Sequence, residues 1–221
     1  MSAAELLSIQ VGHPRTYHEP PRFANRAAPW RSGFVKQPVD GPVWLGELNL
    51  DGDGQGDLNA HGGVDKAVNV YPAEHYDHWI NERLVAGFQP GRFGENFSIR
   101  GLLEAEVCIG DVFALGDARV QVSQPRQPCW KLAHFLDTRD MVRRVVECGR
   151  TGWYFRVLAP GVVAAGQRLE LQERPHPEWP LARANHVMHH ARDPEQEARL
   201  LQCPALSASW RRTLGRRLGR G

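Results

Sequence analysis

The feature that most constrains the fold is a succession of short strand-like segments over the first 172 residues, each bounded by Gly, Pro or Asp. The segments contain β-branched residues or alternate between apolar and polar residues, which is typical of strands with one buried face. They are residues 6–12, 42–50, 66–72, 95–99, 111–124 and 168–172. Residues 116–118, Gly-Asp-Ala, predict a tight hairpin turn between two paired strands. Many short strands joined in this way favour a closed or half-closed barrel over a parallel sheet.

Two helical stretches interrupt the strands. Residues 73–85 place apolar or aromatic side chains at positions 76, 79, 80 and 84, which is close to helical spacing. Residues 138–149 end in Gly149, a residue that suits the position after a helix C-cap. We therefore predict a mostly β fold with helices, in which the helices decorate the barrel.

The pattern changes in the last quarter of the chain. Asp193 stands where a helix N-cap belongs, Pro194 occupies the first helical position and Gln196 the capping-box position. Ser207 offers a further N-cap before another helical stretch. With residues 182–191 before them, these signals predict three short helices.

The linker between the two patterns is residues 173–180, which hold three of the 16 prolines of the chain. A chain of 221 residues with 42% hydrophobic residues can form one good core and a small second unit. We therefore predict a β-barrel domain over residues 1–172 and a three-helix domain over residues 173–221.

Length and charge also restrict the partners. No apolar run approaches the roughly 18 residues of a membrane-spanning helix, and the first 14 residues lack the pattern of a secretion signal. We therefore expect a cytoplasmic protein without membrane association. Residues 173–221 contain nine Lys and Arg against five Asp and Glu, and five of these arginines follow residue 210. Because Trp210 is the one aromatic residue beside them, a solvated helix face is favoured over nucleic acid binding.

The four cysteines, at positions 108, 129, 148 and 203, show no CxxC spacing, so neither a disulfide framework nor a zinc ribbon is indicated. Cys108, Cys148 and Cys203 lie in segments where a small buried side chain is expected. Cys129 differs because it follows two prolines, which places it on a loop. Arg126 and Lys131 are close to it, and positive charge favours the thiolate, a nucleophile and a ligand for soft metals. From these residues alone, an inert loop cysteine covered by its tryptophan neighbour is an equally good interpretation.

Two glycine-rich loops are the other candidates for chemistry. Residues 52–68 match neither a P-loop nor a Rossmann loop, yet His61, Gly62, Asp65 and Lys66 could offer open backbone amides and a cation to a phosphate. The aspartates of this loop fail the EF-hand pattern. His75 and His78 lack a third ligand nearby and favour a polar helix face, and the adjacent His189 and His190 point apart on a helix, which disfavours joint metal binding. Residues 91–98 add Arg92, Asn96 and Ser98, which on their own read as turn residues.

Three stretches in this order, residues 52–76, 91–113 and 122–132, resemble the MOSC-domain proteins, and in particular the YiiM-like group. The likeness continues through residues 151–163 and 209–218, so it covers nearly the whole chain. It implies a MOSC β-barrel followed by a small three-helix C-terminal domain. Val64 departs from the pattern, in which a proline is expected.

The resemblance also implies a molybdenum cofactor, molybdenum bound to molybdopterin, with Cys129 as the metal ligand. The residues expected to contact the pterin or its phosphate are His61, Gly62, Lys66, Arg92, Asn96, Ser98, Arg126 and Cys129. The implied activity is that of an oxidoreductase that reduces N-hydroxylated compounds, such as hydroxylaminopurine-type base analogues, to the amines in a detoxification role. The implied electron donor is a flavoprotein or an iron-sulfur protein. We further expect His61 or Asp65 to shuttle a proton, because both could lie beside the cofactor.

Other readings remain open at this point. Cys129 could carry a persulfide in a sulfur-transfer protein, or the chain could be a non-catalytic module that binds pterins or, through its arginine tail, nucleic acid. The C-terminal helices could also mediate a homodimer.

Overall fold

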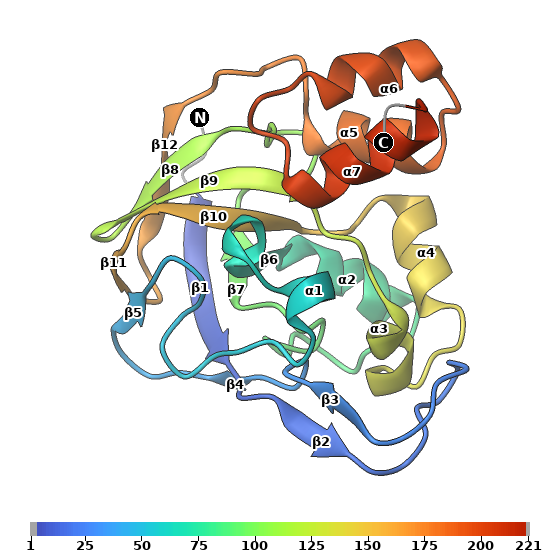
Figure 1. The fold of residues 1–221 in the computed structure, drawn as a ribbon. Helices are drawn as coiled ribbons and strands as arrows, with labels where there is room; N and C mark the ends of the chain where they lie inside the picture. The colour runs from blue at the N-terminus through green and yellow to red at the C-terminus, as the bar shows by residue number, and fades with distance from the viewer. Residues whose placement is uncertain (1–3, 220–221) are drawn as a thin grey trace.

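The computed structural model describes residues 4–219, and its centre is a closed β-barrel (Figure 1). The strand order is β12-β8-β9-β10-β6-β7-β1, and β1 pairs with β12 to close the ring of seven strands. All neighbours are antiparallel except β6 and β7. The strands are β1 (Ala4–Val11), β6 (Val68–Pro72), β7 (Phe97–Arg100), β8 (Val112–Leu115), β9 (Ala118–Pro125), β10 (Trp153–Ala159) and β12 (Arg168–Glu173). The predicted fold class, mostly β with helices, is confirmed.

Short strands extend the barrel at its edges. They are β2 (Arg15–Tyr17), β3 (Trp30–Ser32), β4 (Gln37–Pro38), β5 (Val43–Leu45) and β11 (Gly161–Val163). The pairs β2 with β3 and β5 with β11 form separate two-stranded sheets, while β4 pairs with the end of β1.

The predicted hairpin is confirmed, because Leu115 pairs with Ala118 across a turn in which Gly116 has a φ of 54°. Strand β10 was missing from the predicted strands, although it pairs with both β6 and β9. Its first three residues are consecutive aromatics without an apolar and polar alternation. Trp153 and Phe155 fill the barrel, whereas Tyr154 between them lines a recess at the barrel wall.

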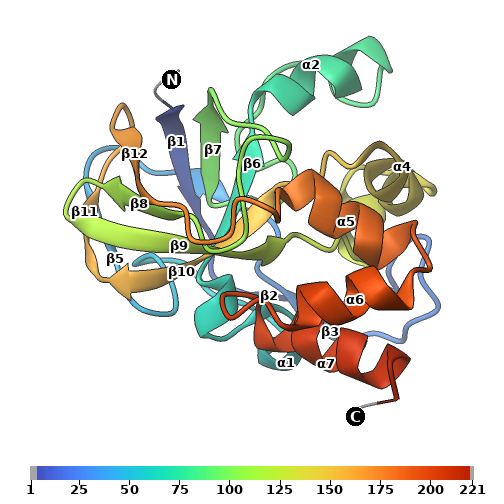
Figure 2. The same cartoon turned by 90° about the horizontal axis from the view of Figure 1, so that it is seen from above.

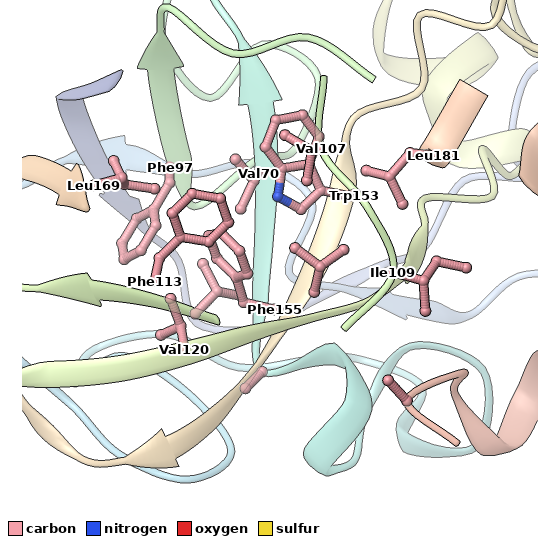
Figure 3. Packing of buried hydrophobic residues seen from close by; sticks show 14 of the residues in the cluster. Val70, Phe97, Val107, Ile109, Phe113, Val120, Trp153, Phe155, Leu169 and Leu181 are labelled. Carbon is pink, nitrogen blue, oxygen red and sulfur yellow. The ribbon is translucent and has the colours of Figure 1, made fainter. Parts of the chain in front are cut away.

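The barrel interior is filled by large apolar side chains from strands on several sides (Figure 3). Phe113 and Phe155, for example, have ring centroids 5.9 Å apart. A second cluster, which includes Tyr71, Trp79 and Phe93, packs three helices against the outside of the barrel. These helices are α2 (Glu74–Asn81), α3 (Trp130–Phe135) and α4 (Met141–Cys148). Gly149 ends α4 with a left-handed φ of 71°, as its position in the sequence predicted.

His75 differs from the expectation of a polar helix face. It lies on α2 but is only 5% exposed, and its Nε2 is 2.8 Å from Glu104 Oε2. His78, one turn further along the helix, is partly exposed and lies 3.2 Å from Glu82. The difference arises because His75 faces the barrel, so that its ring needs a carboxylate partner.

The three expected C-terminal helices are α5 (Leu181–His189), α6 (Pro194–Leu201) and α7 (Ala208–Arg217), seen together in Figure 2. Asp193 accepts hydrogen bonds from the backbone of Glu195 and Gln196, and Ser207 accepts one from Trp210, so both predicted N-caps are confirmed. Apolar residues of these helices belong to the same hydrophobic cluster as the barrel interior. The exact boundary between residues 172 and 173 stays a prediction.

The described residues also form two short helical turns, which are α1 (Leu58–His61) and the 3-10 turn η1 (Val64–Lys66). No helix among residues 4–219 is long and apolar enough to cross a membrane. Arg220, part of the basic tail noted in the sequence, lies outside the described residues.

Candidate functional site

A recess with a volume of about 580 Å³, including the open space at its mouth, lies where β6, β9 and β10 meet the loops before α3 and η1. Five separate stretches of the chain line it, within residues 32–36, 53–69, 94–96 and 126–131 and at Tyr154. The lining residues are Ser32, Gly33, Phe34, Lys36, Asp53, Gly54, Gln55, Gly56, His61, Lys66, Asn69, Gly94, Asn96, Arg126, Gln127, Cys129, Lys131 and Tyr154. The two glycine-rich loops and the cysteine loop, far apart in the sequence, therefore meet at one place.

Cys129 lies at the point where the loop after β9 becomes helix α3. Strand β9 ends at Pro125, and the Arg126 amide donates to Gly152 O at 3.0 Å, which fixes the start of the loop. Cys129 is the N-cap of α3, with an extended φ of −121°, and is half-buried with a free thiol. The neighbouring Trp130 packs on Trp30, with ring centroids 4.8 Å apart. Cys129 therefore lines the recess, which is where a cysteine that binds a metal would have to lie.

The recess is strongly cationic. Lys36, Lys66, Arg126 and Lys131 all line it. Burial is the main cause that lowers the pKa of Lys66 and of Lys131, since desolvation disfavours the ammonium form. A pocket with this charge is complementary to an anionic ligand.

Arg126 carries an unused donor in this wall. The side chain is only 4% exposed, and its Nη2 donates to Phe93 O at 2.8 Å. Its Nη1 is buried and has no hydrogen-bond partner among residues 4–219, and the same holds for Asn69 Oδ1. Buried polar atoms are usually paired in folded proteins, so these two atoms in the recess wall are available to bond a ligand there.

His61 ends helix α1, which Asp57 caps by accepting from the Ala60 amide. Burial lowers the pKa of His61 to about 4, and the charges of Lys131 and Lys66 add to the effect. The imidazole is therefore neutral near pH 7. An anion in the recess would offset the lysine charges and raise this pKa.

The expected site residues divide into two groups. His61, Lys66, Asn96, Arg126 and Cys129 lie together in the recess. The Asn96 amide, however, is already used by the protein: its Nδ2 donates to Gln10 O at 3.1 Å and to Asp53 Oδ2 at 2.8 Å. Asn96 therefore forms part of the recess wall, and its side-chain amide has no donor left for a ligand.

The other four expected residues lie elsewhere. Arg92 is exposed beside a separate surface hollow, and Ser98 is buried, with its hydroxyl donating to Glu95 Oε1 at 3.0 Å. Gly62 follows α1 outside the lining, where its amide donates to Leu58 O at 3.1 Å. The geometry does not place these three residues against a ligand in the recess.

Asp65 also points away from the recess. Arg156 Nη2 lies 2.7 Å from its Oδ1, and the Ala208 amide donates to its Oδ2 at 2.8 Å. Both carboxylate oxygens thus face β10 and the start of α7, because the turn η1 directs alternate side chains to different sides. This corrects the expectation that Asp65 stands beside the cofactor.

Several lining residues were not anticipated from the sequence. Lys36 forms a buried ion pair with Asp53, and Asp53 Oδ1 also accepts from the Gly12 amide at 2.9 Å. Tyr154 lies on the unanticipated strand β10, with the Lys66 Nζ 5.9 Å from its ring centre. Asp53 and Tyr154 lie within stretches that carry the family resemblance but were not singled out there, and Lys36 lies outside those stretches. The only local signal was the charge of Asp53 within the first glycine-rich loop.

Beside the recess, Cys129 also lines a hollow with Arg26, Asp57, Trp130 and Lys131. An outer hollow shares these last four residues and adds Trp30 and Arg31. The guanidinium of Arg26 lies 5.9 Å from the centre of the Trp130 ring. The outer hollow therefore combines aromatic surface with positive charge, next to the cysteine.

Comparisons with known proteins agree with this architecture. The MOSC domain family matches residues 57–170, and the family described as YiiM-like, 3-alpha helix domain matches residues 179–221. The chain is 42% identical over 188 residues to Protein YiiM of Escherichia coli K12, covering 84% of each chain. The crystal structure of YiiM from Geobacillus stearothermophilus has a TM-score of 0.81 and 37% identity, covering 97% of this chain and 99% of that one.

A further relative is longer than this chain. It is a protein of Gibberella moniliformis named Reductase, which is 35% identical over 160 residues, covering 71% of this chain and 28% of that protein. The matching families, the relatives and the barrel with its three terminal helices agree. The chain belongs to the MOSC-domain proteins, in the YiiM-like group that carries the C-terminal three-helix domain.

Proposed function

We propose that the protein is an oxidoreductase that uses the molybdenum–molybdopterin cofactor to reduce N-hydroxylated compounds, such as hydroxylaminopurine-type base analogues, to the amines. One observation carries the proposal: the free thiol of Cys129 opens into a cationic recess in which buried polar atoms have no partner among the described residues. The relative named Reductase supports a reductive reaction.

The residues of the recess fit such a cofactor. A thiolate is a soft ligand suited to a transition metal, so Cys129 would hold the molybdenum. Arg126, Lys66 and Lys131 would hold the anionic phosphate, since charge-assisted hydrogen bonds to phosphate are strong. The unpartnered Nη1 of Arg126 would donate to that phosphate, and Oδ1 of Asn69 would accept a hydrogen bond from the pterin.

The bound cofactor would supply the two electrons that the cleavage of an N–O bond consumes. The complete reaction also consumes two protons for each N-hydroxyl group and releases the amine and water. The site therefore needs a group that carries protons. His61 is the candidate, because its imidazole lines the recess and titrates closer to neutral pH once an anion offsets its lysine neighbours. Asp65 is no longer a candidate, because both of its oxygens are bonded away from the recess.

The outer hollow would position the substrate. Trp130 offers aromatic surface beside Cys129, and planar bases stack on such surfaces. Arg26 and Arg31 would favour polar or anionic substituents at the mouth. For the electron donor we propose a flavoprotein or an iron-sulfur protein.

The test compares wild type with Cys129→Ser, expressed in a host that makes the cofactor. Cys148→Ser is the matched control, since Cys148 is also half-buried and free but lies on α4 outside the recess. We expect Cys129→Ser to lose both molybdenum content, measured by mass spectrometry, and the reduction of an N-hydroxylated purine with an artificial electron donor. The control should retain both.

Two outcomes would contradict the proposal. A Cys129→Ser protein that keeps metal and activity would exclude Cys129 as the ligand. Wild-type protein that carries sulfane sulfur on Cys129 and no molybdenum would support the sulfur-transfer alternative instead.

A further inference from the structure

Asp65 joins three parts of the molecule, although it lies outside the recess. Arg156 on β10 donates to its Oδ1 from Nε at 3.0 Å, and Nη2 of the same arginine lies 2.7 Å away. The backbone amide of Ala208, the first residue of α7, donates to Oδ2 at 2.8 Å. The hydroxyl of Ser123 on β9 donates to the backbone carbonyl of Asp65 at 2.6 Å. A single residue thus ties η1 to two strands of the barrel and to the last helix.

The start of α7 also holds the strand that leads to Cys129 (Figures 1 and 2). The Ser207 amide donates to Ser123 O at 3.0 Å. The hydroxyls of Ser207 and Ser209 donate to Gln124 Oε1 at 2.6 and 2.7 Å. Because Gln124 lies at the end of β9, just before the cysteine loop, the start of α7 contacts two of the segments that lead into the recess, η1 and the end of β9.

The ion pair between Asp65 and Arg156 is partly buried, so it is stronger than a pair on an open surface. The side chains of Asp65 and Arg156 are 20% and 19% exposed, so water screens their ion pair only partly. The carboxylate also faces the N-terminus of a ten-residue helix, where backbone amides and the helix dipole favour negative charge. Arg156 is anchored in turn, since its Nη2 donates to Ala205 O at 2.9 Å.

The contacts of Asp65 affect the recess through Lys66, the next residue in the chain. Lys66 follows Asp65 directly in η1 and lines the recess, where its Nζ donates to Ala60 O at 2.6 Å in the helix of His61. Burial and the charge of Arg212 on α7 both lower the pKa of Lys66. Helix α7 therefore raises the positive potential at η1 and also forms a hydrogen bond to the same turn.

We propose that Asp65 is a positioning residue, which couples the C-terminal helices to the recess by fixing η1 against Arg156 and the first turn of α7. It thereby sets where Lys66 and His61 stand in the recess wall. The inference depends on the proposed function in one respect, namely that the ligand of the recess is the molybdenum cofactor. The coupling itself can be measured in protein that carries no cofactor.

The experiment uses Asp65→Asn, which keeps the size of the side chain but removes the ion pair. The matched control is Asp193→Asn, because Asp193 caps α6 in the same helical region but does not contact η1 or the recess. The pKa of His61 is measured by NMR in cofactor-free protein, and urea unfolding reports the stability of each variant. Molybdenum content per folded protein is measured separately, in a host that makes the cofactor.

We expect Asp65→Asn to change the pKa of His61 by about one unit, because the burial of the imidazole and the position of the Lys66 charge both depend on where η1 lies. Its molybdenum content should fall about threefold or more, because a displaced Lys66 would contact the phosphate less well. Asp193→Asn should leave both quantities at their wild-type values even where it lowers stability.

An unchanged His61 titration in Asp65→Asn would overturn the inference. An equal shift in both variants would also overturn it, because the effect would then follow general destabilisation. If Asp65→Asn does not fold, Arg156→Lys replaces it, since a lysine keeps the charge but loses the forked contact, and the same shift in His61 is expected. Wild-type protein without molybdenum would count against the proposed function alone, and the His61 titration would still decide the coupling.

Discussion

Two buried polar clusters of this protein differ in whether their polar atoms all find hydrogen-bond partners within the protein. His75 and Glu104 are both 5% exposed, and the Glu104 carboxylate accepts from the Gly152 amide at 2.7 Å as well as contacting the histidine. In the recess beside Cys129, cations gather instead, and Nη1 of the buried Arg126 has no partner among the described residues. A cluster that is closed by its own residues holds structure together, whereas an incomplete cluster beside an open recess can take a ligand. Four variants test this difference.

The largest expected effect is in the closed cluster. Glu104→Ala would leave His75 and the Gly152 amide buried without their partner. Breaking a buried pair from one side costs about 3–5 kcal/mol, so the free energy of unfolding should fall by that amount in urea titrations. Glu170→Ala, at an exposed position of β12, is the control and should change it by less than about 0.5 kcal/mol. A loss below about 1 kcal/mol in Glu104→Ala would show that this pair is not structural.

An intermediate effect is expected from His61, and it depends on pH. Its pKa in the folded protein, about 4, lies below the ordinary value of 6.5, so the unfolded chain binds the proton more readily. The contribution of His61 to stability is therefore fully present above pH 6.5 and is lost as the pH falls toward 4. His61→Gln should remove this loss, which makes the variant more resistant to acid by on the order of 1–3 kcal/mol.

The measurement for His61 is urea unfolding at pH 7 and at pH 4.5 for both proteins. His186→Gln is a suitable control, since that residue lies on α5 outside the recess. If wild type and His61→Gln lose stability equally between the two pH values, the imidazole is not held neutral by the recess.

The smallest expected change in stability comes from the recess cations. Lys131→Met removes an ammonium whose burial disfavours its charged form, so the free energy of unfolding should change by less than about 1 kcal/mol or rise. Binding should respond instead: the affinity of cofactor-free protein for inorganic phosphate, measured by calorimetry, should fall about tenfold, as expected for one charge-assisted hydrogen bond.

Lys36→Met provides the contrast within the same recess. Lys36 forms a buried pair with Asp53, so its loss should cost stability as Glu104→Ala does. If Lys131→Met destabilises the protein as strongly as Lys36→Met, the recess is a closed structural cluster and the comparison fails.

The sequence predicted the features that depend on neighbouring residues. The N-caps at Asp193 and Ser207, the helix end at Gly149 and the turn at Gly116 all appear as expected. Each depends on hydrogen bonds or backbone angles within a few residues, so local chemistry decides it.

The site was predicted less completely. The order of the motifs brought His61, Lys66, Arg126 and Cys129 to one recess, but it did not show which way each side chain points. Asp65 and its neighbour Lys66 lie on opposite sides of the same short turn, and only Lys66 faces the recess. No pattern in a one-dimensional sequence distinguishes two adjacent charged residues in such a turn.

The sequence by itself therefore determined the barrel of short strands, the helix ends and the family to which the motifs belong, because these follow from local preferences and from ordered motifs. Only the tertiary structure decided that Lys36 pairs with Asp53, that Arg126 keeps an open donor and that Asp65 binds the last helix. Those outcomes depend on contacts between residues far apart in the chain. They arise from the requirement that each buried charge find a partner, in the protein or in a ligand.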